Sequence, residues 1–469
     1  MASSGVSPAF LLPRTQAGRH QVGLVALAIA LASLTTFRLY ATDEIQYFAH
    51  LRSIVFDQDL DFENEYRWFV ERDPKEYASF RGGYLERTTP TGLRPNNAPI
   101  GSAVLWAPFY LTAVAIERAS GEPPGGEAPG FSQGAVAAVC LGSVFWGTVG
   151  LLLAHAIARR FADAGAALSA TLLVWSGTNL LFYLYVSPPL AHATSFFAVS
   201  LLLWWWVERS PEGERPFVLG LLAGLAASVR WQDGIFLSAP LGAPWLAGRA
   251  RAGPWLRSTA WSAAGALLAF APQLLVWIHL NGSLWPYADI SLGSRVAPLA
   301  PRVLDVFFSS FHGLFVWSPV LAPALAGLVM LAARDARGRA LLLAVALQLA
   351  LLSIYSRAFA HGFGQRLFVS SLPAAIVGLA VFGSRVRRPA SRRLALAAGI
   401  LGVWWSLSLM VQYGTGMIPR DRGVPLRVLL ENQLVRVPAR LPDVLFRYLF
   451  ARRSLYRVDP HAPPAEDRP

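Results

Sequence analysis

The sequence predicts an all-α polytopic membrane protein with about eleven transmembrane helices. The 469 residues are 54% hydrophobic and only 15% charged, whereas soluble domains carry about 25% charged residues. The chain also contains many apolar runs that approach the roughly 20 residues that a helix needs to cross a bilayer. Both observations place most of the chain in lipid.

The distribution of charge agrees with this class. The net charge is +13, but most Lys and Arg residues lie in short loops between apolar runs, as the positive-inside rule describes. The charge therefore indicates no nucleic-acid partner. Cys140 is the single cysteine and lies within an apolar run, which excludes a disulfide within the chain and a thiolate metal site.

The chain is expected to begin with a short cytoplasmic tail, residues 1–20, followed by a first transmembrane helix over 21–40. Ala30-Leu31-Ala32 also fits a signal-peptide cleavage site. The apolar run continues to Tyr40, however, which favours an uncleaved helix. The complete transmembrane domain is expected over 21–416.

Loop charges decide how many later runs cross the membrane. Residues 99–116 are apolar but are interrupted by Pro108. If they lie in the interface, the later Arg-bearing loops share the cytoplasmic side with the N-terminus; if they span, those loops face outward. The rule favours an interfacial 99–116. The other predicted spans are 134–158, 163–184, 191–207, 216–230, 233–248, 256–279, 314–333, 339–356, 366–384 and 393–412.

Two long loops then share the non-cytoplasmic face, residues 41–133 with interfacial helices and residues 280–313. Loops of this length in a compact protein are usually functional or disordered, and their common face suggests one covered cavity. A C-terminal tail, 417–469, follows on the same side. Its segment 426–451 mixes Leu, Val and Phe with Arg, as surface-lying helices do, and its last ten residues are expected to be disordered.

Asp43 and Glu44 stand where the first predicted helix meets water. A helix is expected over residues 43–56. A carboxylate held at a membrane surface is well placed to accept a proton from a hydroxyl. Charges also collect just outside any membrane helix, so catalysis and a merely peripheral position are both open interpretations.

Two polar positions lie at the outer ends of later apolar runs. Arg230 either pairs with Asp233 or has a functional role, because charges at a membrane rim are costly. His312, beside Ser309 and Ser310, lies at a predicted helix entrance. It either binds a phosphate or a metal, or caps the helix.

A short outer loop contains Gln365 and Arg366, together with Arg357 and His361, around a Gly-x-Gly sequence. Arginines on this face break the charge rule. A bound anion would explain them, and so would a structural ion pair with the acidic loop. The sequence contains no phosphate-binding P-loop, dinucleotide fingerprint or His-Glu-x-x-His motif, so a nucleotide-sugar or ATP site has no visible position.

These residues resemble those of the GT-C superfamily of integral-membrane glycosyltransferases, which use polyprenyl-phosphate-linked sugars. The group includes protein O-mannosyltransferases and bacterial enzymes that add aminoarabinose or galacturonic acid to lipid A. The resemblance covers about residues 20–415 in layout. It is carried by Asp43-Glu44 with Ile45 to Leu60 behind it, Asn97-Ala98-Pro99-Ile100, Arg159-Arg160 and Gly364-Gln365-Arg366.

The resemblance implies an inverting transfer of sugar from a polyprenyl-phosphate donor to a lipid, glycan or protein acceptor. It assigns the base to Asp43, with Glu44 beside it. Arg366, Arg230 or a bound divalent ion would offset the charge of the leaving phosphate. Relatives often carry Lys or Arg with two prolines where Asn96-Asn97-Ala98-Pro99 stands here, so Arg94 or Arg366 is expected to contact the phosphate instead.

The implied location is a bacterial inner membrane, with the site on the periplasmic face. The partners are then the lipid-linked donor, the acceptor and the bilayer. The resemblance assigns no metal ligands. Two other functions are weighed: a lipid or glycan transporter or flippase, and a GT-C-like scaffold without activity. A transporter typically has charged residues near the midplane and related halves, whereas the polar residues here gather at one rim and no repeat is visible.

Overall fold

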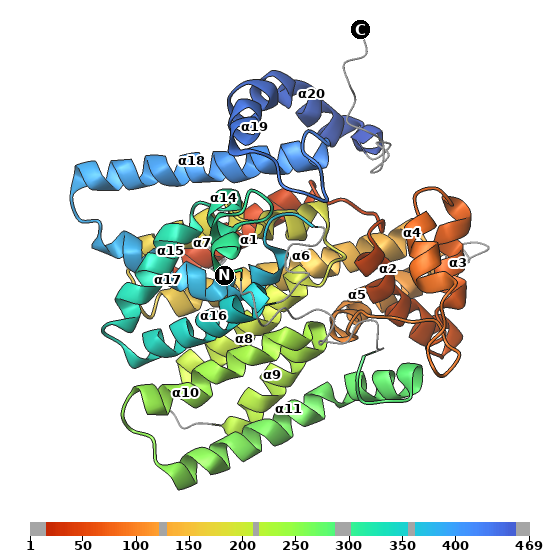
Figure 1. Ribbon diagram of the computed structural model, residues 1–469, viewed down its shortest axis with the longest axis horizontal. Coiled ribbons are helices and arrows are strands. Elements are labelled where there is room, and N and C mark those ends of the chain that lie inside the picture. The colour runs from red at the N-terminus through yellow and green to blue at the C-terminus, as the bar shows by residue number, and fades with distance from the viewer. Residues whose placement is uncertain (1–15, 122–128, 210–214, 287–301, 355–361, 456–469) are drawn as a thin grey trace, which may run out of the picture.

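A computed structural model describes residues 16–121, 129–209, 215–286, 302–354 and 362–455, and every regular element in these ranges is a helix (Figure 1). The predicted all-α class is therefore confirmed. Among the described residues, five helices are long and apolar enough to cross a membrane: 133–158, 252–281, 336–354, 366–385 and 389–414. The total of eleven spans stays a prediction.

The described residues form the following helical elements. In chain order they are α1 (Gln16–Ala32), α2 (Thr42–Arg52), η2 (Ser53–Asp57), α3 (Glu63–Arg72), α4 (Ala78–Phe80), η3 (Arg81–Leu85), α5 (Gly101–Ala119), α6 (Gln133–Ala158), α7 (Ala164–Ser176), η4 (Phe182–Val186), α8 (His192–Arg209), α9 (Pro216–Val229), η6 (Trp231–Leu237), α10 (Ser238–Leu246), α11 (Ala252–Asn281), α13 (Val303–Phe308), α14 (Leu314–Trp317), α15 (Leu321–Ala332), α16 (Ala336–Ile354), η8 (Arg366–Ser371), α17 (Leu372–Arg385), α18 (Pro389–Gly414), α19 (Leu426–Glu431), η9 (Asn432–Arg436), α20 (Val437–Phe450) and η10 (Arg452–Leu455).

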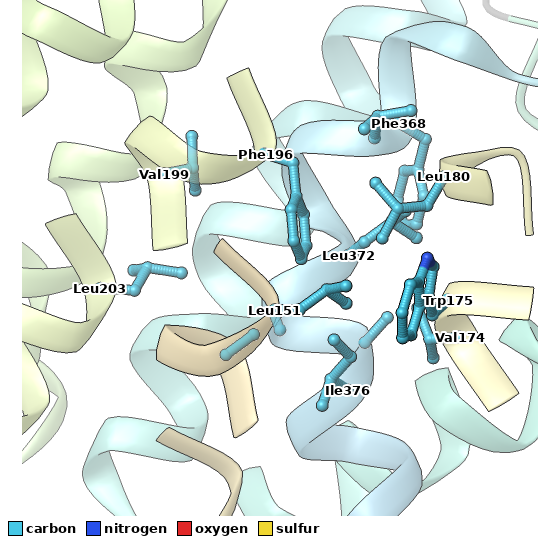
Figure 2. Packing of buried hydrophobic residues seen from close by; sticks show 14 of the residues in the cluster. Leu151, Val174, Trp175, Leu180, Phe196, Val199, Leu203, Phe368, Leu372 and Ile376 are labelled. Carbon is cyan, nitrogen blue, oxygen red and sulfur yellow. The ribbon is translucent and has the colours of Figure 1, made fainter. Parts of the chain in front are cut away.

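The main core lies where α6, α7, α8 and α17 pack together. Leu151, Trp175, Phe196 and Leu372 point toward one another there and are almost fully buried (Figure 2). Helices α11 and α18 lie along opposite edges of the molecule in Figure 1 and keep many large apolar side chains exposed. Exposed apolar helices at the edge of a membrane protein are the surfaces that face lipid.

A second core lies in the long loop that follows α1. Helices α2 to α5 gather at one end of the molecule (right in Figure 1) around buried aromatic side chains such as Phe48 and Tyr66. Arg52 crosses this core: its Nη1 donates to Glu65 at 2.8 Å and also to Asp57, while its Nε donates to the Pro129 carbonyl. The loop is thus a folded unit that holds α2 in place.

Several predicted spans differ from the helices observed. The first helix ends at Ala32 rather than Tyr40, and the Thr36 N–H leaves the helix to donate to the Tyr185 carbonyl at 2.8 Å. The run 314–333 is divided into α14 and α15. Pro319 explains the division, because a proline disfavours helical geometry in the preceding residue, here Ser318.

Other predicted boundaries shift in the same way. Residues 163–184 contain α7, a connection and then η4, and residues 233–248 contain part of η6 and then α10. The predicted helix over 43–56 is observed as α2 and η2, and most of the run 99–116 is helical in α5; its interfacial position stays a prediction. In the outer loop 280–313, positions 287–301 lie outside the described residues, as do Arg357, His361 and the last ten residues of the tail.

The C-terminal segment is helical, as its composition predicted, and lies beside α18 above the bundle in Figure 1. The Gln433 amide donates to the Trp405 carbonyl at 3.0 Å, within α18. Tyr448 Oη donates to the Leu34 carbonyl at 2.8 Å. The tail is therefore attached to both α18 and the end of α1.

Candidate active site

Helix α2 presents its two first-turn carboxylates in different environments. The Asp43 side chain is 45% exposed, whereas Glu44 is completely buried. Glu44 Oε2 accepts hydrogen bonds from the N–H groups of Tyr40 and Ala41 at 2.9 and 3.1 Å, and its Oε1 accepts from Ser187 Oγ. Glu44 therefore caps the helix start, which leaves Asp43 as the accessible carboxylate.

Burial determines the protonation behaviour of Glu44. It raises the pKa of the Glu44 carboxyl to about 7, although the donors on Ser187, Tyr40 and Ala41 stabilise the ionised form. Burial likewise raises the pKa of the Tyr47 hydroxyl, which lies one turn further along α2 and is influenced by the charges of Asp43, Arg230 and Arg366. Tyr47 stays neutral near pH 7 and can donate a hydrogen bond.

Arg366 is the first residue of η8 and forms an ion pair with Asp43, 323 residues earlier in the sequence. Its Nη1 lies 2.9 Å from Asp43 Oδ2. Arg366 was unexpected on the non-cytoplasmic face because the positive-inside rule disfavours arginine there. The structure shows that it forms an ion pair with the acidic loop, which is one of the two explanations given above. The Arg366 side chain stays 22% exposed beside this contact.

Arg230 lies directly behind this pair. It is 5% exposed, and its Nη1 lies 3.0 Å from His192 Nδ1 and 3.4 Å from the Arg366 carbonyl. Asp233 accepts a hydrogen bond from Ser195 Oγ. Arg230 is therefore held by His192 and the backbone of η8 and supplies a second positive charge next to Arg366.

Two further predicted residues are buried, Gln365 next to Arg366 and His312 between α13 and α14. Gln365 is 3% exposed, and neither its Oε1 nor its Nε2 has a hydrogen-bond partner among the described residues. His312 is 1% exposed and adopts a left-handed φ of 65°. Its ring contacts those of Phe311 and Trp317, with centroids 4.1 and 4.9 Å apart.

An aromatic cluster connects these positions. The Trp317 ring meets Phe363, and Phe363 exchanges hydrogen bonds with the Tyr183 hydroxyl through its N–H and carbonyl. Tyr183 in turn packs against His192, with ring centroids 4.1 Å apart. His312 is thus linked to His192, the partner of Arg230, through these ring contacts and hydrogen bonds.

Arg94 and Asn97 lie in the folded outer loop, in the connection between η3 and α5. Arg94 Nη2 pairs with Glu63 at 2.8 Å and so is occupied by a surface partner. The Asn97 N–H donates to Gln46 Oε1 at 2.7 Å, and its side-chain nitrogen donates to Tyr84. Asn97 therefore positions α2, while its Oδ1 has no partner among the described residues.

A metal-binding cluster or a cavity elsewhere among the described residues would be an alternative site. Within the described ranges, no group of three His, Cys, Asp or Glu side chains could hold a metal ion. A cavity of about 480 Å³ lies in the outer loop between Asp59 and Arg72. Several of its charges pair with one another, as Arg67 does with Glu63, and Asp43 does not line it.

Tyr47, Ser187 and His192 were not predicted from the sequence as residues of the site. Each is a polar residue in or beside an apolar run, and this was the signal that could have identified it. Its partner could not be predicted, because Glu44 and Arg230, the partners of Ser187 and His192, lie on distant segments.

The fold and the site together define an all-α membrane protein with a carboxylate–arginine pair at the start of α2. Two crystal structures of ArnT from Cupriavidus metallidurans have a similar fold. The structure bound to undecaprenyl phosphate has a TM-score of 0.54 and 15% identity, over 94% of this chain and 73% of that chain. The apo structure has a TM-score of 0.53 and 14% identity, over 94% and 72%.

This likeness confirms the GT-C-like fold that the sequence resemblance implied. The sequence itself matches no protein-family model and no curated protein at a significant level. The architecture is therefore established by structure, and the reaction has to be argued from the residues of the site.

Proposed function

We propose that this protein is a membrane glycosyltransferase that moves a sugar from a polyprenyl-phosphate donor to a hydroxyl of a lipid, glycan or protein acceptor. The observation that carries the proposal is the Asp43–Arg366 pair, a half-exposed carboxylate 2.9 Å from a guanidinium nitrogen. A base and a cation held together suit a reaction in which a proton is lost and a phosphate leaves. The active face is the non-cytoplasmic one.

Asp43 acts as the base. Its carboxylate accepts the proton of the acceptor hydroxyl while that oxygen attacks the anomeric carbon of the donor sugar. The bond between this carbon and the phosphate oxygen breaks, and its electron pair leaves with the lipid phosphate. Attack opposite the leaving group inverts the configuration at the anomeric carbon. The rigid start of α2, capped by Glu44, fixes the direction of the carboxylate.

Arg366 contacts the donor phosphate. Its Nη1 holds Asp43, and its other nitrogens can donate to phosphate oxygens, for which a guanidinium is geometrically suited. Arg230 adds a second positive charge behind it. Negative charge that develops on the leaving phosphate is then stabilised by groups already in position. Such groups lower the activation free energy because they need not reorganise during the reaction.

Gln365 and Tyr47 are the proposed contacts to the sugar or acceptor. A buried amide without partners costs free energy unless a ligand satisfies it, and both amide atoms of Gln365 are in that condition among the described residues. A polyprenyl phosphate as donor is supported by the similar fold of an ArnT structure that was crystallised with undecaprenyl phosphate.

The experiment that tests the proposal is turnover of a polyprenyl-phosphate sugar by purified protein. Asp43→Asn is nearly isosteric, so the protein should fold while turnover falls by about a hundredfold or more, the usual loss when a general base is removed. Glu44→Gln is the matched control and should lose less, because glutamine also serves in a capping box.

Two results would contradict the proposal. Near-normal turnover in Asp43→Asn, or a larger loss in Glu44→Gln, would remove Asp43 from the role of base. Movement of the lipid-linked sugar across a vesicle membrane without any transfer to an acceptor would favour a flippase instead.

A further inference from the structure

We propose that His20, His155 and Arg159 form a second anion site, which binds a phosphate group at the end of the bundle opposite Asp43. His20 lies in the first turns of α1 and His155 in the last turn of α6. The opposite ends of these two helices lie near α2: Asp43 follows the C-terminal end of α1, and Gln133 at the start of α6 donates to the Phe37 carbonyl. The site is therefore separate from the proposed active site.

The three side chains form a cluster. The His20 and His155 rings meet edge to face with centroids 5.8 Å apart, and Arg159 follows His155 by four residues, so the two share one face at the end of α6. Arg159 is the first residue after α6. Two helix ends thus bring three nitrogen-rich side chains to one place.

Their nitrogen atoms are buried and unsatisfied. Within the described residues, four atoms lack a hydrogen-bond partner: His20 Nδ1, both ring nitrogens of His155 and Arg159 Nη1. His155 is 1% exposed. Burying such groups without partners is unfavourable, and inside a membrane protein a polar cluster of this kind commonly marks a binding function.

The surrounding charges favour an anion over a cation. The neighbouring acids are already engaged: Glu208 pairs with Arg160, and Asp163 caps α7 by accepting from the Ala166 N–H at 2.9 Å. No set of three metal-ligating side chains occurs in the described ranges, and the guanidinium of Arg159 would repel a cation. The unesterified oxygens of a phosphate group accept hydrogen bonds, the guanidinium of Arg159 only donates them, and each imidazole ring can donate through its N–H.

The phosphate has two chemical sources at a membrane surface: the headgroup of an anionic phospholipid and free inorganic phosphate. His20 and Arg159 are partly exposed, so either source can reach the cluster. If neither source binds, the cluster is not a phosphate site. The experiment therefore has to distinguish three outcomes.

The test compares Arg159→Gln with its neighbour Arg160→Gln, which removes the same charge from the pair with Glu208. Each protein is titrated with inorganic phosphate in detergent and with phosphatidylglycerol in phosphatidylcholine nanodiscs. Binding is followed through the ring ¹⁵N signals of histidine, with His20→Gln and His155→Gln used for assignment. The loss of one charge-assisted hydrogen bond should weaken binding about tenfold in Arg159→Gln, and Arg160→Gln should bind as the unmodified protein does.

A saturable response to phosphatidylglycerol alone identifies a headgroup, and a response to inorganic phosphate identifies free phosphate; either supports the proposal if Arg159→Gln weakens it. The absence of any saturable response, or an equal loss in Arg160→Gln, overturns it. Asp43→Asn should bind phosphate at this site unchanged, so a failure here is distinguishable from a failure of the proposed transferase function.

Discussion

At the scale of single residues, the adjacent carboxylates Asp43 and Glu44 lie in different environments. Neighbouring positions on a helix point about 100° apart, so Asp43 and Glu44 face different surroundings. Asp43 lies half-exposed against Arg366, and Glu44 is buried under the start of α2. The same side-chain chemistry therefore supplies a reactive group at one position and a helix cap at the next.

Replacement of Arg366 tests its proposed contact with the donor phosphate. Arg366→Ala should weaken donor binding strongly, since it removes both the cation and the partner of Asp43. Arg366→Lys should recover only part of the affinity, because an ammonium cannot bind two phosphate oxygens as a guanidinium does. Donor affinity can be measured by titration of purified protein with a polyprenyl-phosphate sugar. Unchanged affinity in Arg366→Ala would refute the assignment.

The buried Glu44 carboxyl should make stability depend on pH. Its pKa is raised from 4.5 to about 7 by burial, so the folded state binds the proton more tightly than the unfolded state. This contribution is fully present below about pH 4.5 and is lost as the pH rises through 7, a change of about 3 kcal/mol at most. Thermal unfolding between pH 5 and 8 should be less pH-dependent in Glu44→Gln. An unaltered pH dependence in that variant would exclude Glu44 as the source.

At the scale of elements, close helix packing depends on small residues. A Cβ on Gly327 in α15 would stand 1.8 Å from the Gly378 carbonyl oxygen in α17, and one on Gly220 in α9 would stand 2.0 Å from the Ser262 carbonyl oxygen in α11. Small residues at such crossings let helix backbones approach closely in membrane proteins. These contacts orient the bundle that carries η8 and Arg366.

Substitution at one crossing provides a direct test. Gly327→Ala should lower the free energy of unfolding by about 1–3 kcal/mol, because α15 must move away from α17. Gly383→Ala is the control: its Cβ would lie 3.8 Å from the Ala166 Cβ, so stability should stay the same or rise slightly. Thermal unfolding in detergent measures both. Equal effects of the two variants would contradict the packing argument.

At the scale of the whole molecule, the C-terminal segment indicates which end of the bundle it covers. Tyr448 and Arg452 donate to carbonyls of residues 33–35, at the end of α1 that leads to α2. The tail therefore lies on the same side as the candidate active site. This agrees with the topology in which the acidic loop and the tail share the non-cytoplasmic face.

Cysteine labelling in intact vesicles tests this arrangement. The single native Cys140 is buried and should give little background. Asp61→Cys and Ser454→Cys should react from the same side of the membrane, and Arg251→Cys and Arg387→Cys from the other. Labelling of Asp61→Cys and Arg387→Cys from one side would disprove the eleven-span topology.

Much of this protein was predictable from its residues alone. Composition and run length identified a polytopic helical membrane protein, since lipid accepts only segments that are apolar and internally hydrogen-bonded. The position of Asp43-Glu44 after the first apolar run identified the candidate carboxylates, and the unexpected charge of Arg366 identified an anion-binding or ion-pair position. These are local properties, readable within one segment.

The partners of those residues depended on three-dimensional packing. Asp43 and Arg366 lie 323 positions apart, and neither segment contains a signal that names the other. The sequence also could not assign Glu44 to the helix cap, because its donor Ser187 lies on a distant segment. Helices that are apolar on every side carry little periodicity to show which face meets which neighbour, so close contacts at small residues decide how they pack. Those contacts brought the carboxylate, the two arginines and His192 to one end of the bundle.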